Sequence, residues 1–236
     1  MVRSDLETAR GLFDYVTVYS TVSSASSTSQ QRVNVNDDDE RRLSDMLKEV
    51  FGAARASEIA AKSRPRPPFR DIFDYAVRAG VSPQELESIA DRITTSARPP
   101  STGLINVNTA PRQVLLCLPG LSEGDVTNLT SRRQSATKVG SIAWVLDALG
   151  PKAVGLGNWI TGRSSRYSAD IVTVSEDGRA YKRCRIVLDA GRSPPRILYR
   201  TDLTDFGWPL DLQIILSLRA GNGLPPSAYS TNRGAF

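Results

Sequence analysis

The side chains whose type and spacing could support chemistry in this chain are amides and carboxylates. Two Asn-x-Asn motifs, Asn34 with Asn36 and Asn106 with Asn108, each precede a segment with helical periodicity. Short polar side chains at such positions accept hydrogen bonds from the first amides of a helix, so capping is the expected role of each asparagine. Four consecutive carboxylates, residues 37–40, follow the first motif and suit the positive end of a helix.

Clustered carboxylates are also the ligands that calcium prefers, so calcium is the one ion that the sequence leaves open. The run Asp37-Asp38-Asp39-Glu40 lacks the spacing of an EF-hand loop, and carboxylates at a helix start are common. Three further candidates are weaker: Asp202, Asp205 and Asp211. No set of metal ligands is assigned.

The chain of 236 residues contains no histidine. This excludes histidine as a general acid or base, the Ser-His and Cys-His nucleophiles, and most zinc sites. The chain also has no cofactor-binding loop and no convincing pair of catalytic carboxylates. We therefore expect a protein that is not an enzyme and that takes no small-molecule substrate.

Cysteine usage, charge and hydropathy set the remaining limits. Cys117 lies in the apolar run VLLCL and Cys184 in a predicted strand, so both are expected to be buried free thiols, with a disulfide left open. The net charge of +5 is scattered, which permits an acidic partner without indicating one. No run of 18 apolar residues and no hydrophobic signal region is present, which suggests a cytoplasmic protein or a soluble piece of a longer one.

An internal repeat organises the middle of the chain. The Asn-x-Asn motif at residues 34–36 recurs at 106–108, Ile72 corresponds to Ile142, and the dipeptide Ile-Thr at 93–94 recurs at 160–161. Both copies share one order of segments, with small deletions in the second. We predict two related helical lobes, residues 32–98 and 104–162, joined by the Pro/Ser-rich stretch 97–103.

Local signals mark the ends of several helices in these lobes. Ser82 and Glu85 have the spacing of a capping box, with proline at the first helical position, and Ser122 with Asp125 repeats the pattern. Two glycines are expected to end the helices before them: Gly80 and Gly150.

The segments outside the lobes have a different periodicity. Residues 1–31 are predicted to hold a helix (1–13), a strand (15–20) and a polar Ser/Thr-rich loop (21–31). In residues 165–219, alternating runs flank Asp177-Gly178, which predicts a hairpin, followed by a third strand at 196–203 and a possible fourth at 212–218. The tail 220–236 is expected to be disordered. The predicted fold class is α+β: an antiparallel sheet with a large inserted all-α region made of the two lobes.

The stretch LINVNTAPRQVLLCLPG, residues 104–120, predicts a helix–hairpin–helix over residues 109–133. Asn108 or Thr109 is expected to cap the first helix. Pro111 is expected to start that helix, where its missing amide hydrogen costs no hydrogen bond. A Pro-Gly pair then turns the chain sharply, with a positive φ at the glycine. The residues expected to build this unit are Asn108, Thr109, Pro111, Pro119, Gly120 and Ser122.

The string INVNTAPxxVLxxLPGLS, followed by a helix that ends at Arg132-Arg133, resembles the type II secretion protein K family, the largest minor pseudopilin. The segment FDYVTVYS, residues 13–20, is similar to the one that precedes the first Asn-x-Asn in that family, and the resemblance covers roughly residues 6–204. It implies a pseudopilin-like sheet and a structural role at the tip of the pseudopilus.

The resemblance also implies partners and a location. The partners would be other, smaller minor pseudopilins. The location would be the periplasmic side of the bacterial inner membrane, and the role would be to support export of folded proteins across the outer membrane. Family members begin with a hydrophobic helix after a cleaved leader, and membrane contact would run through that helix, which this sequence does not contain. Proteins of this kind can carry calcium.

The alternative is a DNA-binding protein, because the same motif resembles the helix–hairpin–helix domain of competence proteins. In those proteins a Gly-hydrophobic-Gly hairpin offers backbone amides to a DNA phosphate. The corresponding triplet here is Gly120-Leu121-Ser122, which lacks the second glycine, and Glu123 and Asp125 follow at once. Carboxylates beside a phosphate site repel it, so nucleic acid is not the expected partner.

Overall fold

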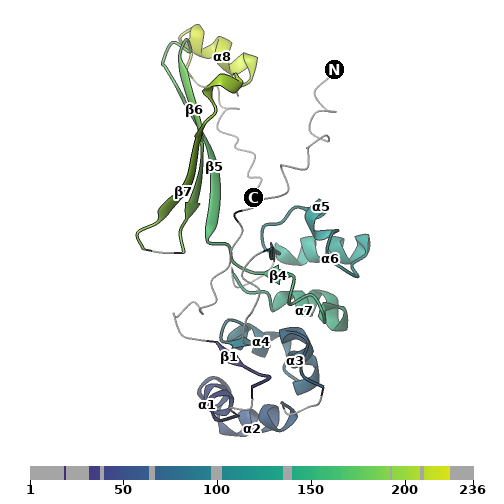
Figure 1. Cartoon of the computed structure of the whole chain (residues 1–236). Helices are drawn as coiled ribbons and strands as arrows, with labels where there is room; N and C mark the ends of the chain where they lie inside the picture. The colour runs from purple at the N-terminus through teal and green to yellow at the C-terminus, as the bar shows by residue number, and fades with distance from the viewer. Residues whose placement is uncertain are drawn as a thin grey trace. The chain divides into compact units, whose positions relative to one another are not determined.

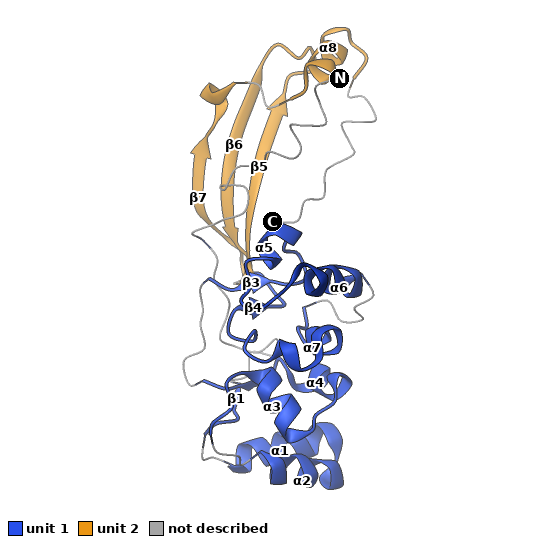
Figure 2. Cartoon of the chain, turned by 90° about the vertical axis from the view of Figure 1, so that its right-hand side faces the viewer, with its two compact units in different colours: residues 1–164 blue, residues 165–236 orange. Residues whose placement is uncertain are grey.

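Apolar residues at helical spacing dominate the first two thirds of the chain, whereas apolar and polar residues alternate in the region after residue 165. The structure follows this division. The computed structural model describes residues 19, 32–37, 40–63, 67–96, 103–134, 140–191, 193–207 and 210–223. The chain divides into two compact units, residues 1–164 and 165–236 (Figure 2). The first contains the helical lobes and the second an antiparallel sheet, so the α+β class is confirmed (Figure 1).

The first lobe is closed by a short parallel strand pair. Strand β1 (Val33–Asn34) pairs with β2 (Ile93–Thr94), so the two ends of the lobe meet. The helices that the structure describes between these strands are α1 (Glu40–Phe51), α2 (Ala53–Lys62), α3 (Ile72–Ala79) and α4 (Pro83–Ile89).

The second lobe repeats this closure. Strand β3 (Ile105–Asn106) pairs in parallel with β4 (Ile160–Thr161). The elements between them are shorter: α5 (Arg112–Leu115), α6 (Glu123–Arg133), α7 (Trp144–Leu149) and the 3-10 turn η2 (Gly150–Ala153). The paired positions of β3 and β4 are those that the sequence repeat matches with β1 and β2.

The two predicted capping boxes and the two predicted helix-ending glycines are confirmed. The Ser82 hydroxyl accepts from the Glu85 amide while the Glu85 carboxylate accepts from the Ser82 amide, and Ser122 and Asp125 form the same box. Gly80 ends α3 with φ +70° and Gly150 ends α7 with φ +55°. Each signal acts within one helical turn, so the local sequence is sufficient to specify it.

Glu85 makes the stability of the first lobe depend on pH. The Arg55 guanidinium donates to both its carboxylate oxygens, at 2.7 and 2.9 Å, and with the Ser82 amide it lowers the pKa of Glu85 from its ordinary value of 4.5 to about 2, against the effect of burial. A carboxyl group whose pKa is lower in the folded state stabilises the protein at pH values above its pKa in the unfolded state. This stabilisation is lost as the pH falls from about 4.5 to about 2.

We expect Glu85→Gln to be less stable than the parent near pH 7 and the difference to shrink as the pH falls through this window. Urea melts of both proteins between pH 2.5 and 7 measure it. A difference that stays constant across the window would show that the charge on Glu85 contributes nothing to folding.

The two lobes share one apolar core. Its largest fully buried side chains include Phe73 and Tyr75 of α3, Leu86 of α4, and Leu129 of α6. Burial of such side chains is worth about 1.5–3 kcal/mol each and is the main force that holds short helices in place.

The second unit is a three-stranded antiparallel sheet in the order β5 (Arg166–Val174), β6 (Tyr181–Asp189), β7 (Arg196–Asp202). The predicted hairpin at Asp177-Gly178 is confirmed, with Gly178 at φ +62°, and so is the third strand. On one face Tyr167 pairs with Leu188, which pairs with Ile197. On the other, Asp170 forms ion pairs with both Arg183 and Arg185.

The prediction of a strand at 212–218 is wrong, because this segment forms helix α8 (Leu212–Arg219) after the short 3-10 turn η3 (Thr204–Phe206). The Asp211 carboxylate caps the helix by accepting from the Gln213 amide, and Ile215 and Leu218 share its buried side. An apolar run such as LQIILSL fits a strand or a buried helix equally well, and the cap and the packing decide between them.

Burial of Cys117 was also predicted wrongly. Cys117 is exposed and donates from its thiol to the Gln113 carbonyl, whereas its neighbours Leu115 and Leu118 occupy the buried side of the turn. Cys184 is half-buried, and both cysteines are free thiols.

Several expectations fall on residues outside the described part of the chain. These are the helix at 1–13, the strand at 15–20 except Tyr19, the loop at 21–31, the linker at 97–102, and the tail beyond residue 223. Within the described ranges, no helix has the length and apolar character needed to cross a membrane.

Candidate functional site

The two Asn-x-Asn motifs lie at matching places, where the first strand of each lobe ends. The first asparagine of each motif turns the chain: the Asn34 Oδ1 accepts from the Asn36 amide at 3.1 Å, and the Asn106 Oδ1 accepts from the Asn108 amide at 3.0 Å. An asparagine that accepts from the amide two residues later forms an Asx turn. These two asparagines therefore end strands, and do not cap helices.

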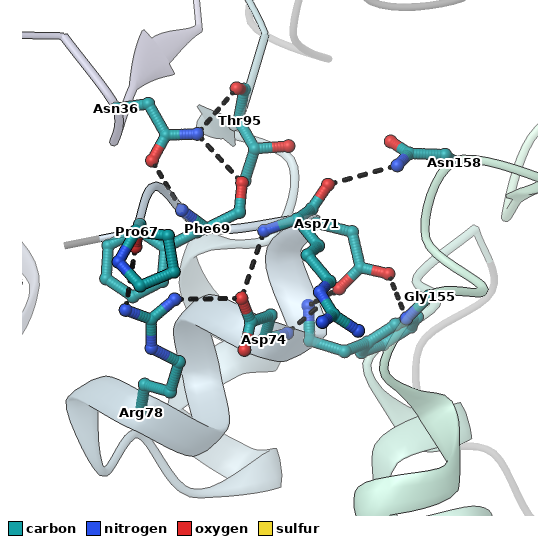
Figure 3. A network of polar contacts seen from close by, with 11 residues as sticks. Asn36, Pro67, Phe69, Asp71, Asp74, Arg78, Thr95, Gly155 and Asn158 are labelled. Carbon is teal, nitrogen blue, oxygen red and sulfur yellow. Dashed lines mark hydrogen bonds and ion pairs between the residues drawn. The ribbon is translucent and has the colours of Figure 1, made fainter. Parts of the chain in front are cut away.

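The second asparagine of the first motif joins distant segments. The Asn36 Nδ2 donates to the carbonyls of Phe69 and Thr95, both at 2.9 Å, and its Oδ1 accepts from the Phe69 amide at 2.9 Å (Figure 3). Phe69 precedes α3 and Thr95 follows β2. One half-buried amide side chain thus holds the segment before α3 against the C-terminal ends of both strands of the closing pair.

The same arrangement recurs in the second lobe. The Asn108 Nδ2 donates to the carbonyls of Ser141, at 3.3 Å, and Gly162, at 2.8 Å. Ser141 precedes α7 and Gly162 follows β4. The Asn108 Oδ1 accepts from the Trp144 indole at 2.9 Å, where its counterpart Asn36 accepts from a backbone amide.

Helix capping by Asn108 or Thr109 was therefore predicted wrongly. Helix α5 begins at Arg112 after an extended Pro111, with no side-chain cap, so Pro111 also lies just before the helix instead of at its first position. The amides of Thr109 and Ala110 instead donate to the Asn106 carbonyl. The Asn108 side chain is used across the lobe, at separations of 33 and 54 residues that a local motif does not reveal.

Sequence reasoning missed the partners of these asparagines. The first partner lies 33 residues after the second asparagine in both lobes, as Phe69 and as Ser141. This constant spacing was the signal that could have identified them. The second partners, Thr95 and Gly162, directly follow the repeated Ile-Thr dipeptides.

The loop that Asn36 contacts is held from its other side by an ion pair on α3. The Asp74 Oδ2 accepts from the Arg70 amide at 3.0 Å and from the Arg78 guanidinium at 3.1 Å (Figure 3). Arg78 also donates to the Pro67 carbonyl at 2.8 Å and lies 4.7 Å from the centroid of the Phe69 ring. Polar groups on both sides therefore fix this loop in place.

The predicted hairpin between α5 and α6 is present, and Gly120 has the expected positive φ, +78°. The Asp125 carboxylate occupies the start of α6, where the Ser122 hydroxyl and amide and then Lys152 donate to it and lower its pKa. Arg133, at the other end of α6, donates to the Ala110 carbonyl at 2.7 Å. The polar groups of this hairpin thus contact other groups of the same lobe.

Gly120→Val is expected to lower the free energy of unfolding by about 1–2 kcal/mol, because a β-branched residue is strained at positive φ. No atom lies within 4 Å of an added Cβ there, so the cost is conformational strain without a clash. Ser122→Ala removes one cap and should cost about 1 kcal/mol. Thermal melts measure both changes. A Gly120→Val protein with the same melting temperature as the parent would show that valine is not strained at this position.

Two of the carboxylates that were candidate calcium ligands have other partners in the structure. Asp202 accepts from Lys182 and from Thr204, and Asp211 caps α8. Asp38 and Asp39 lie outside the described residues. Among the residues that are described, no group of three or more acidic, histidine or cysteine side chains is arranged to hold a metal ion.

The arrangement as a whole positions backbone segments. Each motif asparagine binds main-chain groups or an indole of its own lobe, and the hairpin cap binds a lysine of its own lobe. Such contacts rigidify a scaffold, and they leave function to the surfaces that the scaffold presents. Comparison with protein-family models, with curated proteins and with solved structures found no match to this chain.

Proposed function

We propose that this chain is a structural component of a type II secretion machine, a minor pseudopilin of the protein K kind. The proposal rests on the resemblance of residues 104–122 to that family together with the order of elements. A helical insert of two lobes is followed by an antiparallel hairpin and a further strand. The segment FDYVTVYS before the insert adds to the resemblance.

The observation that carries the proposal is the use made of the motif residues. Asn106, Asn108, Gly120 and Ser122 all serve the internal construction of the second lobe, through a strand end, a joint between segments, a turn and a helix cap. A motif used in this way is expected in a protein whose function is to present a rigid shape. A catalytic or ligand-binding motif would direct polar groups toward a pocket.

The mechanism that follows is steric. A pseudopilus grows by adding subunits, and a bulky helical insert on one subunit would prevent another from adding beyond it. The chain would then cap the tip, in contact with two smaller minor pseudopilins, on the periplasmic side of the inner membrane. Its contribution to export of folded proteins across the outer membrane would be to define that tip.

The test is deletion of the gene in the source bacterium, with the amount of folded protein released into the medium as the readout. We expect release to fall by at least about ten-fold, with the same proteins retained in the periplasm, and the intact gene in trans to restore it. Total synthesis of those proteins is the control. Unchanged release after deletion would overturn the proposal.

The alternative, DNA binding through the hairpin, is disfavoured by the contacts of its polar groups. The Ser122 amide, which would face a phosphate, donates to Asp125 at 3.0 Å. Arg133 donates to a carbonyl and Arg132 forms an ion pair with Asp147 at 3.3 Å. A phosphate would have to displace a carboxylate from the start of α6.

We therefore expect the chain to show no saturable binding to a duplex below about 10 µM at physiological salt, the range of non-specific binders. Fluorescence anisotropy with a labelled duplex at several salt concentrations measures this. Tight binding with a steep salt dependence, flattened by Arg132→Ala or Arg133→Ala, would instead favour the DNA-binding alternative.

A further inference from the structure

The two lobes meet at a buried carboxylate. Asp71 is 1% exposed and precedes α3. Its Oδ1 accepts from the amides of Phe73, at 3.0 Å, and Asp74, at 2.9 Å, which caps the helix of the first lobe. Its Oδ2 accepts from the amides of Gly155, at 2.6 Å, and Gly157, at 2.9 Å, which belong to the second lobe (Figure 3).

The receiving loop of the second lobe is shaped for this oxygen. Gly155 has φ +98°, a conformation that glycine adopts at little cost. A Cβ on Gly157 would lie 2.8 Å from the Asp71 Cβ and 3.0 Å from its Cγ, so only glycine permits the approach. Two amides two residues apart thus converge on one anion, as in the backbone nests that bind anions elsewhere.

The internal repeat places a shorter side chain at this position in the second lobe. In the alignment of Ile72 with Ile142, Ser141 takes the position of Asp71. The Ser141 hydroxyl accepts from the Ala143 amide at 3.1 Å, two residues on, as the Asp71 Oδ1 accepts from Phe73. A single oxygen therefore serves this turn in the second lobe. Asp71 provides one more oxygen, and the amides of Gly155 and Gly157, which donate to it, both belong to the other lobe.

The other polar ties at this joint are more exposed. The Asn158 side chain donates to the Arg70 carbonyl at 3.0 Å, and Arg163 lies 3.4 Å from an oxygen of Asp91. Exposed ion pairs contribute little to stability, whereas hydrogen bonds from amides to a buried carboxylate are among the strong ones. Among the described residues, the hydrogen bonds of the Asp71 Oδ2 are thus the principal polar contact between the lobes.

We propose that Asp71 is a latch between the repeats: its second oxygen couples docking of the second lobe to the start of α3, so that the two lobes open and close as one body. This inference does not depend on the proposed function. It predicts that the amides of Gly155 and Gly157 are protected from hydrogen exchange by Asp71, although 84 and 86 residues separate them in sequence.

The test is hydrogen exchange on the full chain, parent and Asp71→Ser. Serine keeps one oxygen that can accept from the Phe73 amide, as Ser141 accepts from the amide two residues later, and it removes the oxygen that accepts from Gly155 and Gly157. We expect the amides of these two glycines to exchange at least about ten-fold faster, because their buried acceptor is gone. The amides of Phe73 and Asp74 should change by less than about three-fold. Unchanged exchange at both glycines would overturn the proposal.

Two matched variants separate the latch from general destabilisation. Gly157→Ala pushes the carboxylate away without altering it, and the Gly155 amide should again exchange at least about ten-fold faster. Asp74→Asn alters a buried acid at the start of α3, and the hydrogen bonds of that acid to Arg70 and Arg78 stay within the first lobe. The exchange rates of the Gly155 and Gly157 amides should therefore not rise through local opening. Equal acceleration by Asp74→Asn would contradict the latch.

The parent chain supplies a test that needs no variant. If the lobes open as one body, the amides of Gly155 and Gly157 must exchange with the same dependence on low urea concentrations as those of Phe73 and Asp74. Glycine amides that exchange with no urea dependence, by local fluctuation alone, while those of α3 follow global unfolding, would show that Asp71 does not couple the lobes.

Discussion

Asn36→Ala is expected to lower the free energy of unfolding by about 2–4 kcal/mol. The substitution removes three hydrogen bonds at once and takes the partner from the Phe69 amide and from the carbonyls of Phe69 and Thr95. A half-buried backbone group that loses its partner costs about 1–3 kcal/mol, and water can reach part of this site. Urea melts followed by far-UV circular dichroism measure the change.

Two further variants test the cause. Asn128→Ala removes an exposed asparagine whose single bond goes to the Ala148 carbonyl, and it should cost no more than about 1 kcal/mol. Asn36→Asp keeps the acceptor for the Phe69 amide but sets a carboxylate oxygen against the carbonyl oxygens of Phe69 and Thr95, so it should be no more stable than Asn36→Ala. If Asn36→Ala costs no more than Asn128→Ala, the asparagine does not hold the lobe together.

Because the contacts recur, Asn108→Ala should have an effect similar to that of Asn36→Ala. Asn108 also makes three bonds, to Ser141, Gly162 and the Trp144 indole. Loss of the indole bond gives this variant a second readout, a shift in the tryptophan fluorescence of the folded state.

Gly162→Ala is expected to be the most damaging single-methyl addition, with a cost of about 3 kcal/mol or more. An added Cβ would overlap the Gly140 carbonyl oxygen and lie 2.7 Å from its carbon and 2.9 Å from the Ser141 carbonyl carbon. These are backbone atoms, which cannot rotate away as a side chain can, so the end of β4 must move. That movement would also break the bond from Asn108.

Gly124→Ala is the matched control, because Gly124 lies inside α6 and an added Cβ would be 3.8 Å from the Ser122 hydroxyl, an ordinary contact. Alanine is a better helix former, so this variant should be more stable than the parent by about 0.5–1 kcal/mol. The two melts should therefore shift in opposite directions. A Gly162→Ala protein within about 1 kcal/mol of the parent would mean that β4 and the 140–141 segment are not packed as described.

Features defined within a few residues were predictable from the sequence. The capping boxes of Ser82 and Ser122 each involve a partner three residues away, and Gly120 and Gly178 have the positive φ that turns of their kind require. Such signals depend on backbone geometry and on short side chains, which act in the same way in any fold. The change in periodicity near residue 165 likewise separated helices from strands.

Where two structures satisfy the same local pattern, the sequence was not sufficient. Residues 212–218 fit a strand by composition, and packing of Ile215 and Leu218 together with the Asp211 cap makes them a helix. Cys117 lies in an apolar run, yet the turn places it on the outside. In both cases, the position of the hydrophobic core relative to the segment decides which side chains are buried and which element forms. The local sequence does not specify that position.

By itself, the sequence determined the class of the fold, the two capping boxes, the hairpin and the existence of a repeat. Only the tertiary structure decided what the motif asparagines and Asp71 do. Asn108 resembles a helix cap in sequence, but its acceptors lie 33 and 54 residues away, and the second oxygen of Asp71 meets amides 84 and 86 residues away. A side chain's oxygen or amide can satisfy a near or a distant partner at similar energy, and only the folded backbone determines which of them comes within 3 Å.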